Sequence, residues 1–284
     1  MIWTHNLSPF IFRVHINGVD IGPRWYGLAY VIGFILGYGA LKKAWRAGRF
    51  PGLAENEIEN LMLWIVGGVV FGGRLGYCVQ NMGEWAKDPF YFFHFNQGGM
   101  AFFGGLVGVA LVLVWFSRKR GVSFLTLGDV CSVPAALGLG IGRIANFING
   151  ELPGNRTDGS WGVIFPNIDP GHPRHPSVLY EMATHFVLAG VLIWAGRQPW
   201  ANRRAGVLSA LFVLVYGLLR VVTEAFREAD TYVGPLTNGQ AASLVIAALG
   251  AAALAMLFKQ KPPLAAEIGE NLEKNGEDGN GSAD

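Results

Sequence analysis

Long apolar runs separated by short polar or basic segments make up most of this chain. Seven such runs are each close to the roughly 20 residues that a helix needs to cross a bilayer. The pattern predicts an all-α integral membrane protein with seven transmembrane helices. The expected spans are residues 25–41, 58–79, 99–116, 125–149, 178–195, 206–226 and 240–258.

The segments outside the spans predict three further regions. Residues 1–23 alternate apolar and polar positions, which predicts an amphipathic interfacial segment lying on the membrane. Residues 151–176 carry five prolines, which favours an ordered or semi-ordered loop in a small head region rather than a helix. The acidic tail, 262–284, is expected to be disordered. The transmembrane domain would then occupy residues 24–261.

The basic residues predict the orientation of the helices. The connections after the first, third, fifth and seventh spans carry 4, 3, 3 and 2 lysines or arginines, whereas the longer connections on the opposite side carry six. Because short cytoplasmic loops are enriched in lysine and arginine, the N-terminus is expected outside and the C-terminus in the cytoplasm. The long loop 151–176 would then face the non-cytoplasmic side.

Composition agrees with a membrane protein and excludes several other classes. Hydrophobic residues make up 51% and charged residues 15%, against roughly 25% charged in soluble domains. The net charge of +2 gives no reason to expect a nucleic-acid partner. The two cysteines, Cys78 and Cys131, form neither a disulfide framework nor a zinc motif. The six histidines lack tight ligand spacing, so no metal site and no cofactor are expected.

Arginine recurs inside the apolar runs, where it is costly and therefore a candidate for function. Arg143, Asn146 and Gly150 follow one another at spacings of four or less, which predicts that they share a helical face. Burying an arginine at hydrocarbon depth costs roughly 2.5 to 3.5 kcal/mol on insertion scales. This helix is therefore expected to bring a cation and amide groups to the non-cytoplasmic surface of the membrane that it crosses.

The sixth span carries a second polar stripe. Tyr216, Arg220, Glu224 and Arg227 are spaced four, four and three residues apart. One interpretation is an Arg220–Glu224 pair that only joins helices. The other is that the Arg143 and Arg220 guanidinium groups converge on a phosphodiester through forked hydrogen bonds, which would imply a phospholipid headgroup.

Other polar residues of the spans have two interpretations each. Arg74, among glycines, suits helix packing as well as headgroup contact. Tyr26 suits an interfacial anchor or a hydrogen-bonding site residue, and His175 suits a proton-transfer group or a loop contact. Ser177 is expected to cap the fifth helix, and Gln240 to mark the start of the seventh or to face the site.

Six stretches resemble, in the same order, the bacterial prolipoprotein diacylglyceryl transferases. They are RWYGLAY, FGGRLGY, GGMAFFGGLVG, GRIANFINGELPG, RHPSVLYE, and YGLLRVVTEAFR followed by GQAAS. The resemblance implies a transferase that moves the sn-1,2-diacylglyceryl group of phosphatidylglycerol to the thiol of the lipobox cysteine of prolipoproteins and releases glycerol phosphate. It also implies a multi-pass protein of the bacterial inner membrane whose active site faces the outer leaflet and whose partners are the prolipoprotein signal peptide and the lipid bilayer.

The resemblance also implies roles for residues at matching positions. The expected catalytic residues are Arg143, Arg220, Tyr26, Glu151 and His175. The expected phosphatidylglycerol-binding residues are Arg143, Arg220, Asn146, Gly154, Tyr216, Glu224 and Arg227.

Three positions depart from the family pattern. Phe103 replaces a histidine that many members carry, and its ring cannot accept a proton, so we expect the base to be His175, Tyr26 or Glu151. Val178 and Pro153 replace a glutamine and an aromatic residue, which would alter loop contacts with the protein substrate. The alternative is a non-catalytic lipid-binding relative that retains the phosphate site. A transporter would require repeated broken helices, and the sequence shows no such repeats.

Overall fold

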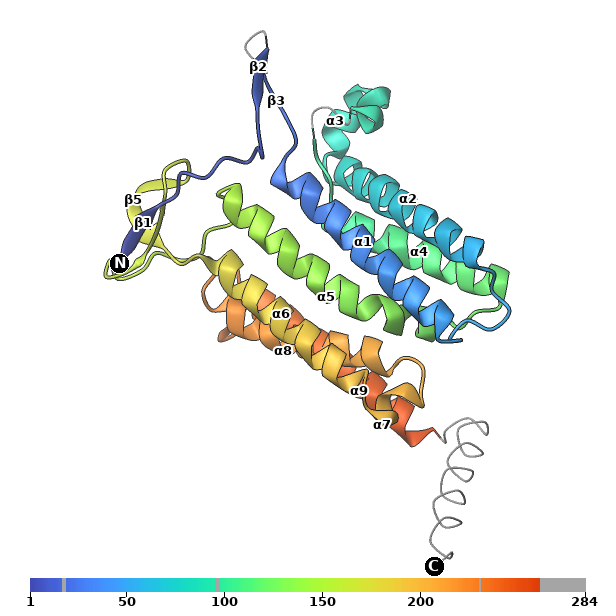
Figure 1. The fold of residues 1–284 in the computed structure, drawn as a ribbon. Coiled ribbons are helices and arrows are strands. Elements are labelled where there is room, and N and C mark those ends of the chain that lie inside the picture. The colour runs from blue at the N-terminus through green and yellow to red at the C-terminus, as the bar shows by residue number, and fades with distance from the viewer. Residues whose placement is uncertain (17–18, 95–97, 230, 261–284) are drawn as a thin grey trace, which may run out of the picture. The chain divides into compact units, whose positions relative to one another are not determined.

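The computed structural model describes residues 1–16, 19–94, 98–229 and 231–260 (Figure 1). The acidic tail 262–284, expected to be disordered, and the end of the predicted transmembrane domain at Lys261 lie outside these residues. The chain divides into two compact units, one of Met1–Ala29 with the residues from Ala135 onward and one of Tyr30–Pro134. Helices α1 (Trp25–Arg46) and α5 (Phe124–Ile148) each contribute residues to both units.

In the Tyr30–Pro134 unit, glycines let two helices pack in direct backbone contact. Helix α2 (Glu55–Gln80) lies beside α4 (Phe102–Arg120), and the short elements α3 (Met82–Lys87) and η1 (Pro89–Phe93) connect them (Figure 1). A methyl group at Gly72 would overlap the Gly104 carbonyl oxygen, and one at Gly104 would overlap the Gly72 carbonyl oxygen. Small residues four apart are a common means of close helix association in membranes.

Arg74 on α2 has a structural role in this unit. Its side chain is almost fully buried and donates hydrogen bonds to backbone carbonyl oxygens of η1 and of residues that follow it before α4, namely those of Tyr91, Phe92, His94, Gly98 and Gly99. Buried backbone carbonyl groups need such donors. Of the two interpretations of Arg74, the contacts favour packing, since the guanidinium holds this segment of the chain in place.

In the other unit, three long helices pack together. Helix α6 (Ser177–Ala195) contacts α8 (Val207–Glu224), and α8 contacts α9 (Asn238–Lys259), while α7 (Pro199–Asn202) lies in the connection between α6 and α8. Helix α9 begins with a capping box in which Thr237 Oγ1 accepts from Gln240 N and Gln240 Oε1 accepts from Thr237 N. The helix-start interpretation of Gln240 is therefore confirmed.

The N-terminal segment and the long loop together form a small sheet. Strand β1 (Ile2–Thr4) pairs in parallel with β4 (Gly162–Phe165), which pairs antiparallel with β5 (Asp169–Arg174). Two short antiparallel pairs complete the strands: β2 (Val14–Ile16) with β3 (Val19–Ile21), and β6 (Tyr232–Val233) with β7 (Leu236–Thr237). The loop 151–176 is therefore ordered, as predicted. Residues Ile2–Thr4 of the predicted interfacial segment form a strand that pairs with the long loop, and the place of residues 1–23 on the membrane stays a prediction.

Asp169 anchors this sheet through three cationic or polar partners. Its carboxylate accepts from Arg156 Nε at 2.7 Å and Arg174 Nε at 3.0 Å, and His172 Nδ1 lies 2.9 Å from its other oxygen. The hydrogen bond with His172, followed by that from Arg156, holds the pKa of Asp169 well below its usual range. The ionised carboxylate is therefore part of the folded head.

We expect Asp169→Asn to lower the thermal midpoint of the purified protein at pH 7 by a few degrees. Because the folded-state pKa is depressed, Asp169 stabilises the fold above its unfolded pKa of roughly 3.9, and this stability is lost as the pH falls toward the lower folded value. Thermal unfolding in detergent between pH 7 and pH 3 should show the gap between wild type and variant closing below about pH 4. A gap of constant size would contradict this assignment.

Within the described residues, six helices are long and apolar enough to cross a membrane: α2, α4, α5, α6, α8 and α9. The first predicted span corresponds to α1, which forms a helix of 22 residues but is not among these six. Tyrosines and glycines interrupt its apolar run. The chain is therefore a mostly helical, multi-pass membrane protein with small sheets beside the helices.

Candidate functional site

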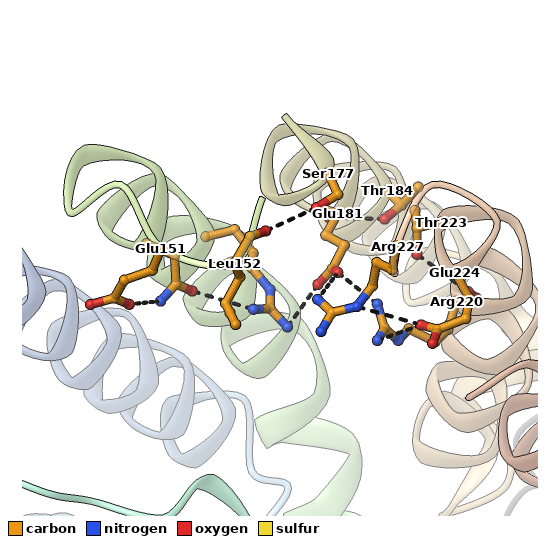
Figure 2. A network of polar contacts seen from close by, with 11 residues as sticks. Glu151, Leu152, Ser177, Glu181, Thr184, Arg220, Thr223, Glu224 and Arg227 are labelled. Atoms are coloured by element: carbon orange, nitrogen blue, oxygen red, sulfur yellow. Dashed lines mark hydrogen bonds and ion pairs between the residues drawn. The ribbon is translucent and has the colours of Figure 1, made fainter. Parts of the chain in front are cut away.

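A buried carboxylate on one helix joins three arginines from two other parts of the chain. Glu181, in the second turn of α6, has 1% of its side chain exposed. Its Oε2 lies 2.7 Å from Arg143 Nη2 on α5, and its Oε1 lies 2.6 Å from Arg220 Nη1 on α8 and 3.0 Å from Arg227 Nη1 just after α8 (Figure 2). We refer to Glu181, Glu224 and these three arginines as the arginine cluster. All five residues belong to one unit of the fold.

Glu224 supports the cluster from α8. Its Oε2 lies 2.7 Å from Arg220 Nη2 and 3.7 Å from Arg227 Nε (Figure 2). The spacing of four residues between Arg220 and Glu224 places them on one helical face, so the predicted pair is confirmed. Arg220 also reaches Glu181 on α6 and through it Arg143 on α5, so the network joins three helices, and its role in binding a phosphodiester stays a prediction.

A chain of amides continues from the cluster to the end of α5. Arg143 Nη1 donates to Asn146 Oδ1 at 3.3 Å, and Asn146 Nδ2 donates to Glu151 Oε2 at 2.8 Å. Asn149 Nδ2 donates to the other oxygen of Glu151 at 3.0 Å. Arg143 and Asn146 thus share a helical face, as predicted, and the loop residue Glu151 and Asn149 lie with them. Gly150 does not share the helical face, because α5 ends at Ile148 and Gly150 has a φ of 70°.

The charges of the cluster leave capacity for an anion. Three guanidinium groups face two carboxylates, a net charge of +1 when all five groups are ionised. The arginine side chains stay 20–25% exposed, while Glu181 is almost fully buried. Each guanidinium has five N–H donors, and the carboxylates use only some of them. The cluster therefore holds three cations in place and keeps donors available for a further ligand.

Leu152 and Ser177 fasten the loop after α5 to the start of α6. Leu152 has a φ of 54°, in the left-handed region, which costs a non-glycine residue roughly 1–2 kcal/mol. The buried Ser177 hydroxyl donates to the Leu152 carbonyl oxygen at 3.0 Å (Figure 2). The prediction that Ser177 caps α6 is wrong. Pro176 occupies the cap position, without a capping hydrogen bond from its side chain, and the Ser177 hydroxyl makes the tertiary contact with Leu152 instead.

Gly154 and His175 lie together beside this loop. Gly154 N donates to the His175 carbonyl oxygen at 2.8 Å, and a methyl group at Gly154 would overlap the Phe226 carbonyl oxygen. The glycine is therefore required for close approach of three segments. The His175 ring packs against Trp161, Tyr180 and Phe226, and its Nδ1 lies 3.1 Å from the Tyr180 hydroxyl. This aromatic setting places His175 in loop packing, and its catalytic role stays a prediction.

Tyr216 and Tyr26 are placed differently. Tyr216 stacks on Phe212 with a ring separation of 5.9 Å, and it lines a cavity of about 10 Å³ together with Arg220 and His185. Such a volume admits about one water molecule. Tyr26 is the second residue of α1 and is half-buried. The structure thus brings Tyr216 to the neighbourhood of the cluster, and it leaves the role of Tyr26 a prediction.

Sequence reasoning missed the central residue. Glu181 was visible only as the last letter of RHPSVLYE, in the early turns of an apolar helix. A carboxylate within a membrane span is itself a signal for a buried partner, and an intramembrane arginine such as Arg143 needs one. Which helix supplied it could not be read from spacing within a single segment.

The cluster, its amide extension and the loop from Glu151 to Gly154 are formed by the stretches that suggested a family resemblance. Residues 13–256 match the family model described as Prolipoprotein diacylglyceryl transferase. A phosphatidylglycerol–prolipoprotein diacylglyceryl transferase of Bordetella bronchiseptica is 40% identical over 250 residues, covering 86% of this chain and 94% of the relative. Proteins of the same name from Pseudoalteromonas atlantica and Geobacter sulfurreducens are 43% and 41% identical, covering 80% and 90% of this chain and 78% and 97% of theirs.

The match extends over most of both chains and includes every helix that contributes to the arginine cluster. This chain belongs to the prolipoprotein diacylglyceryl transferase family.

Proposed function

We propose that this chain transfers the sn-1,2-diacylglyceryl group of phosphatidylglycerol to the thiol of the lipobox cysteine of a prolipoprotein, releasing glycerol phosphate. Membership of the family supports the reaction, since the relatives carry its name. The observation that carries the proposal is the arginine cluster, in which three partly exposed guanidinium groups converge on Glu181.

The charge of the cluster matches the proposed lipid. Phosphatidylglycerol carries one negative charge on its phosphodiester and none on its glycerol, so it would neutralise the net +1 of the cluster. A zwitterionic headgroup would bring an additional cation close to three arginines, which is unfavourable at short range in a partly buried site. We therefore infer that Arg143 and Arg220 hold the phosphate, with Arg227 and Glu224 supporting them.

The proposed reaction is a displacement at the glyceryl carbon that bears the phosphate oxygen. The cysteine sulfur forms a C–S bond as the C–O bond breaks, and the electron pair of that bond leaves on the phosphate. The thiol proton is taken up by a base and can pass to the phosphate monoester, whose second pKa is roughly 6. Nearby guanidinium groups favour the thiolate over the thiol and stabilise the charge that develops on the leaving phosphate.

Three residues remain candidates for the base. Phe103 is not one of them: it lies in the first turn of α4, 71% exposed, and its ring has no proton-accepting atom. Glu151 is exposed and already accepts from two asparagines, while His175 has a ring nitrogen near the Tyr180 hydroxyl. Tyr26 is the third candidate. Asn146, Gly154 and Tyr216 would position the loop and helix that carry the phosphate-binding groups.

The proposal includes a topology. With α1 counted as a span, seven helices cross the membrane, the N-terminus lies outside and the C-terminus in the cytoplasm, as the basic residues predict. The arginine cluster and the head sheet would then face the outer leaflet of the bacterial inner membrane, where a signal peptide presents its lipobox cysteine. The division into residues 1–23, a catalytic transmembrane domain 24–261 with its outer loop 151–176, and a tail 262–284 is part of the same proposal.

A transfer assay tests this function. The purified chain is incubated with phosphatidylglycerol vesicles and a synthetic lipobox peptide, and both glycerol phosphate and the mass of the peptide are measured. We expect a peptide heavier by one diacylglyceryl group for each glycerol phosphate released. The Phe103→His variant run beside the wild type shows whether a histidine at this position adds to the rate.

The two chains together distinguish the alternatives. Turnover by the wild type supports the transferase and places the base outside position 103. No turnover by the wild type with turnover restored by Phe103→His would instead support the non-catalytic, lipid-binding relative.

A further inference from the structure

Leu152 has an unusual backbone beside the arginine cluster. Among the described residues it is the one non-glycine residue with a clearly positive φ, at 54°. Glycine adopts this region at no steric cost, and asparagine and aspartate adopt it more readily than leucine does. The backbone of this loop therefore does not require a leucine, and a smaller or polar residue would hold it with less strain.

The strained leucine is held in place from both sides. The Leu152 carbonyl oxygen accepts a hydrogen bond from the buried Ser177 hydroxyl at the start of α6 (Figure 2). The preceding residue, Glu151, is held by Asn146, which in turn accepts from Arg143. The loop thus fixes the position of Leu152 relative to the phosphate-binding arginines.

The side chain so positioned is apolar and open. Leu152 is 43% exposed, although its neighbours Glu151 and Asn149 make polar contacts. A strained residue in a sparsely populated backbone region, at a site of charged groups, is an observation from which a function can be inferred. An apolar side chain offered at this place fits a ligand with an apolar segment next to an anionic group.

We propose that Leu152 is a specificity-determining residue that contacts the apolar part of the substrate adjoining the reacting centre. This rests on the proposed transferase function. The apolar segment has two possible sources in that reaction: the glyceryl ester and acyl chains next to the phosphate of the lipid, or the apolar side chains that precede the cysteine of the peptide. Both chemistries would cover the exposed leucine on binding.

Two substitutions distinguish the effect of the Leu152 side chain from the effect of its backbone conformation. Leu152→Asn suits the left-handed conformation and removes the apolar surface, whereas Leu152→Met retains an apolar side chain of similar size. We expect Leu152→Asn to raise the apparent KM of one substrate roughly tenfold, with kcat within about twofold and no loss of thermal stability. Leu152→Met should stay within about twofold of wild type in all three quantities.

The substrate whose KM rises identifies the source. A rise for phosphatidylglycerol alone, matched by weaker binding of the lipid without peptide, indicates the lipid; a rise for the lipobox peptide alone indicates the peptide. Leu7→Asn, at a residue that is 42% exposed in the N-terminal segment, is the matched control and should change neither KM.

Unchanged KM values in Leu152→Asn, or a fall in kcat alone, would overturn the inference, since a contact that helps to bind either substrate would appear in its KM. An inactive wild type would instead overturn the transferase function. Leu152 would then be tested by comparing the binding of phosphatidylglycerol and of the lipobox peptide to wild type and to Leu152→Asn, and equal binding of both would overturn its role.

Discussion

Arg143→Ala and Arg220→Ala should each reduce transfer of the diacylglyceryl group by at least 10²–10³-fold, the cost typical of removing a charged or hydrogen-bonding group that stabilises a developing anion. Each variant removes one guanidinium group while Glu181 retains its other two partners. The protein should therefore still fold and insert in the membrane. The measurement is glycerol phosphate release by the purified variants.

The matched control is Arg118→Ala, since Arg118 is exposed in the last turn of α4. It changes the net charge of the chain by the same amount and should keep wild-type activity. Arg143→Lys and Arg220→Lys keep the charge but lose the forked donor geometry, so we expect intermediate rates. Wild-type turnover in either alanine variant would contradict a phosphate-binding role for that arginine.

Glu181→Gln should have the second large effect, on both stability and rate. The glutamine keeps the size of the side chain but removes the charge that three arginines share, which raises the net charge of the cluster from +1 to +2. Removing one partner of a buried ion pair costs about 3–5 kcal/mol, and solvent access to the arginines places the expected loss at the lower end of that range.

The kinetic pattern of Glu181→Gln distinguishes positioning from simple binding. A more positive cluster still attracts an anionic lipid, so the KM for phosphatidylglycerol should change little, while kcat should fall roughly 100-fold because the guanidinium groups lose their common anchor. Glu84→Gln, at an exposed residue of α3, is the control. Equal stability and equal kcat in Glu181→Gln and wild type would refute the central role of Glu181.

The helices and the polar stripe could be predicted because both depend on local pattern. Apolar length predicted the long helices, with bounds that differ from the observed ones by a few residues, and a spacing of four predicted the Arg220–Glu224 pair. Arg143 and Arg220 could be expected to converge because intramembrane arginines are costly and both lie at the same end of their spans.

The remaining features depend on contacts between distant parts of the chain. Strand β1 pairs with β4 across about 160 residues, as Ile2 with Gly162, and a strand of only three residues carries no signal of that partner. Ser177 had the spacing of a helix cap, but its hydroxyl bonds to Leu152, a tertiary partner. The position of Glu181 between three arginines required the packing of α5, α6 and α8.

Lipid binding without peptide tests the central claim most directly, because it isolates the cluster from the chemistry. The wild type and an Arg143→Gln, Arg220→Gln double variant are purified and mixed with equal amounts of phosphatidylglycerol and phosphatidylcholine, and retained lipid is counted by native mass spectrometry. We predict that the wild type retains phosphatidylglycerol in preference to phosphatidylcholine and that the double variant loses this preference. Equal retention and equal preference in the two proteins would show that the arginine cluster does not bind the phosphodiester.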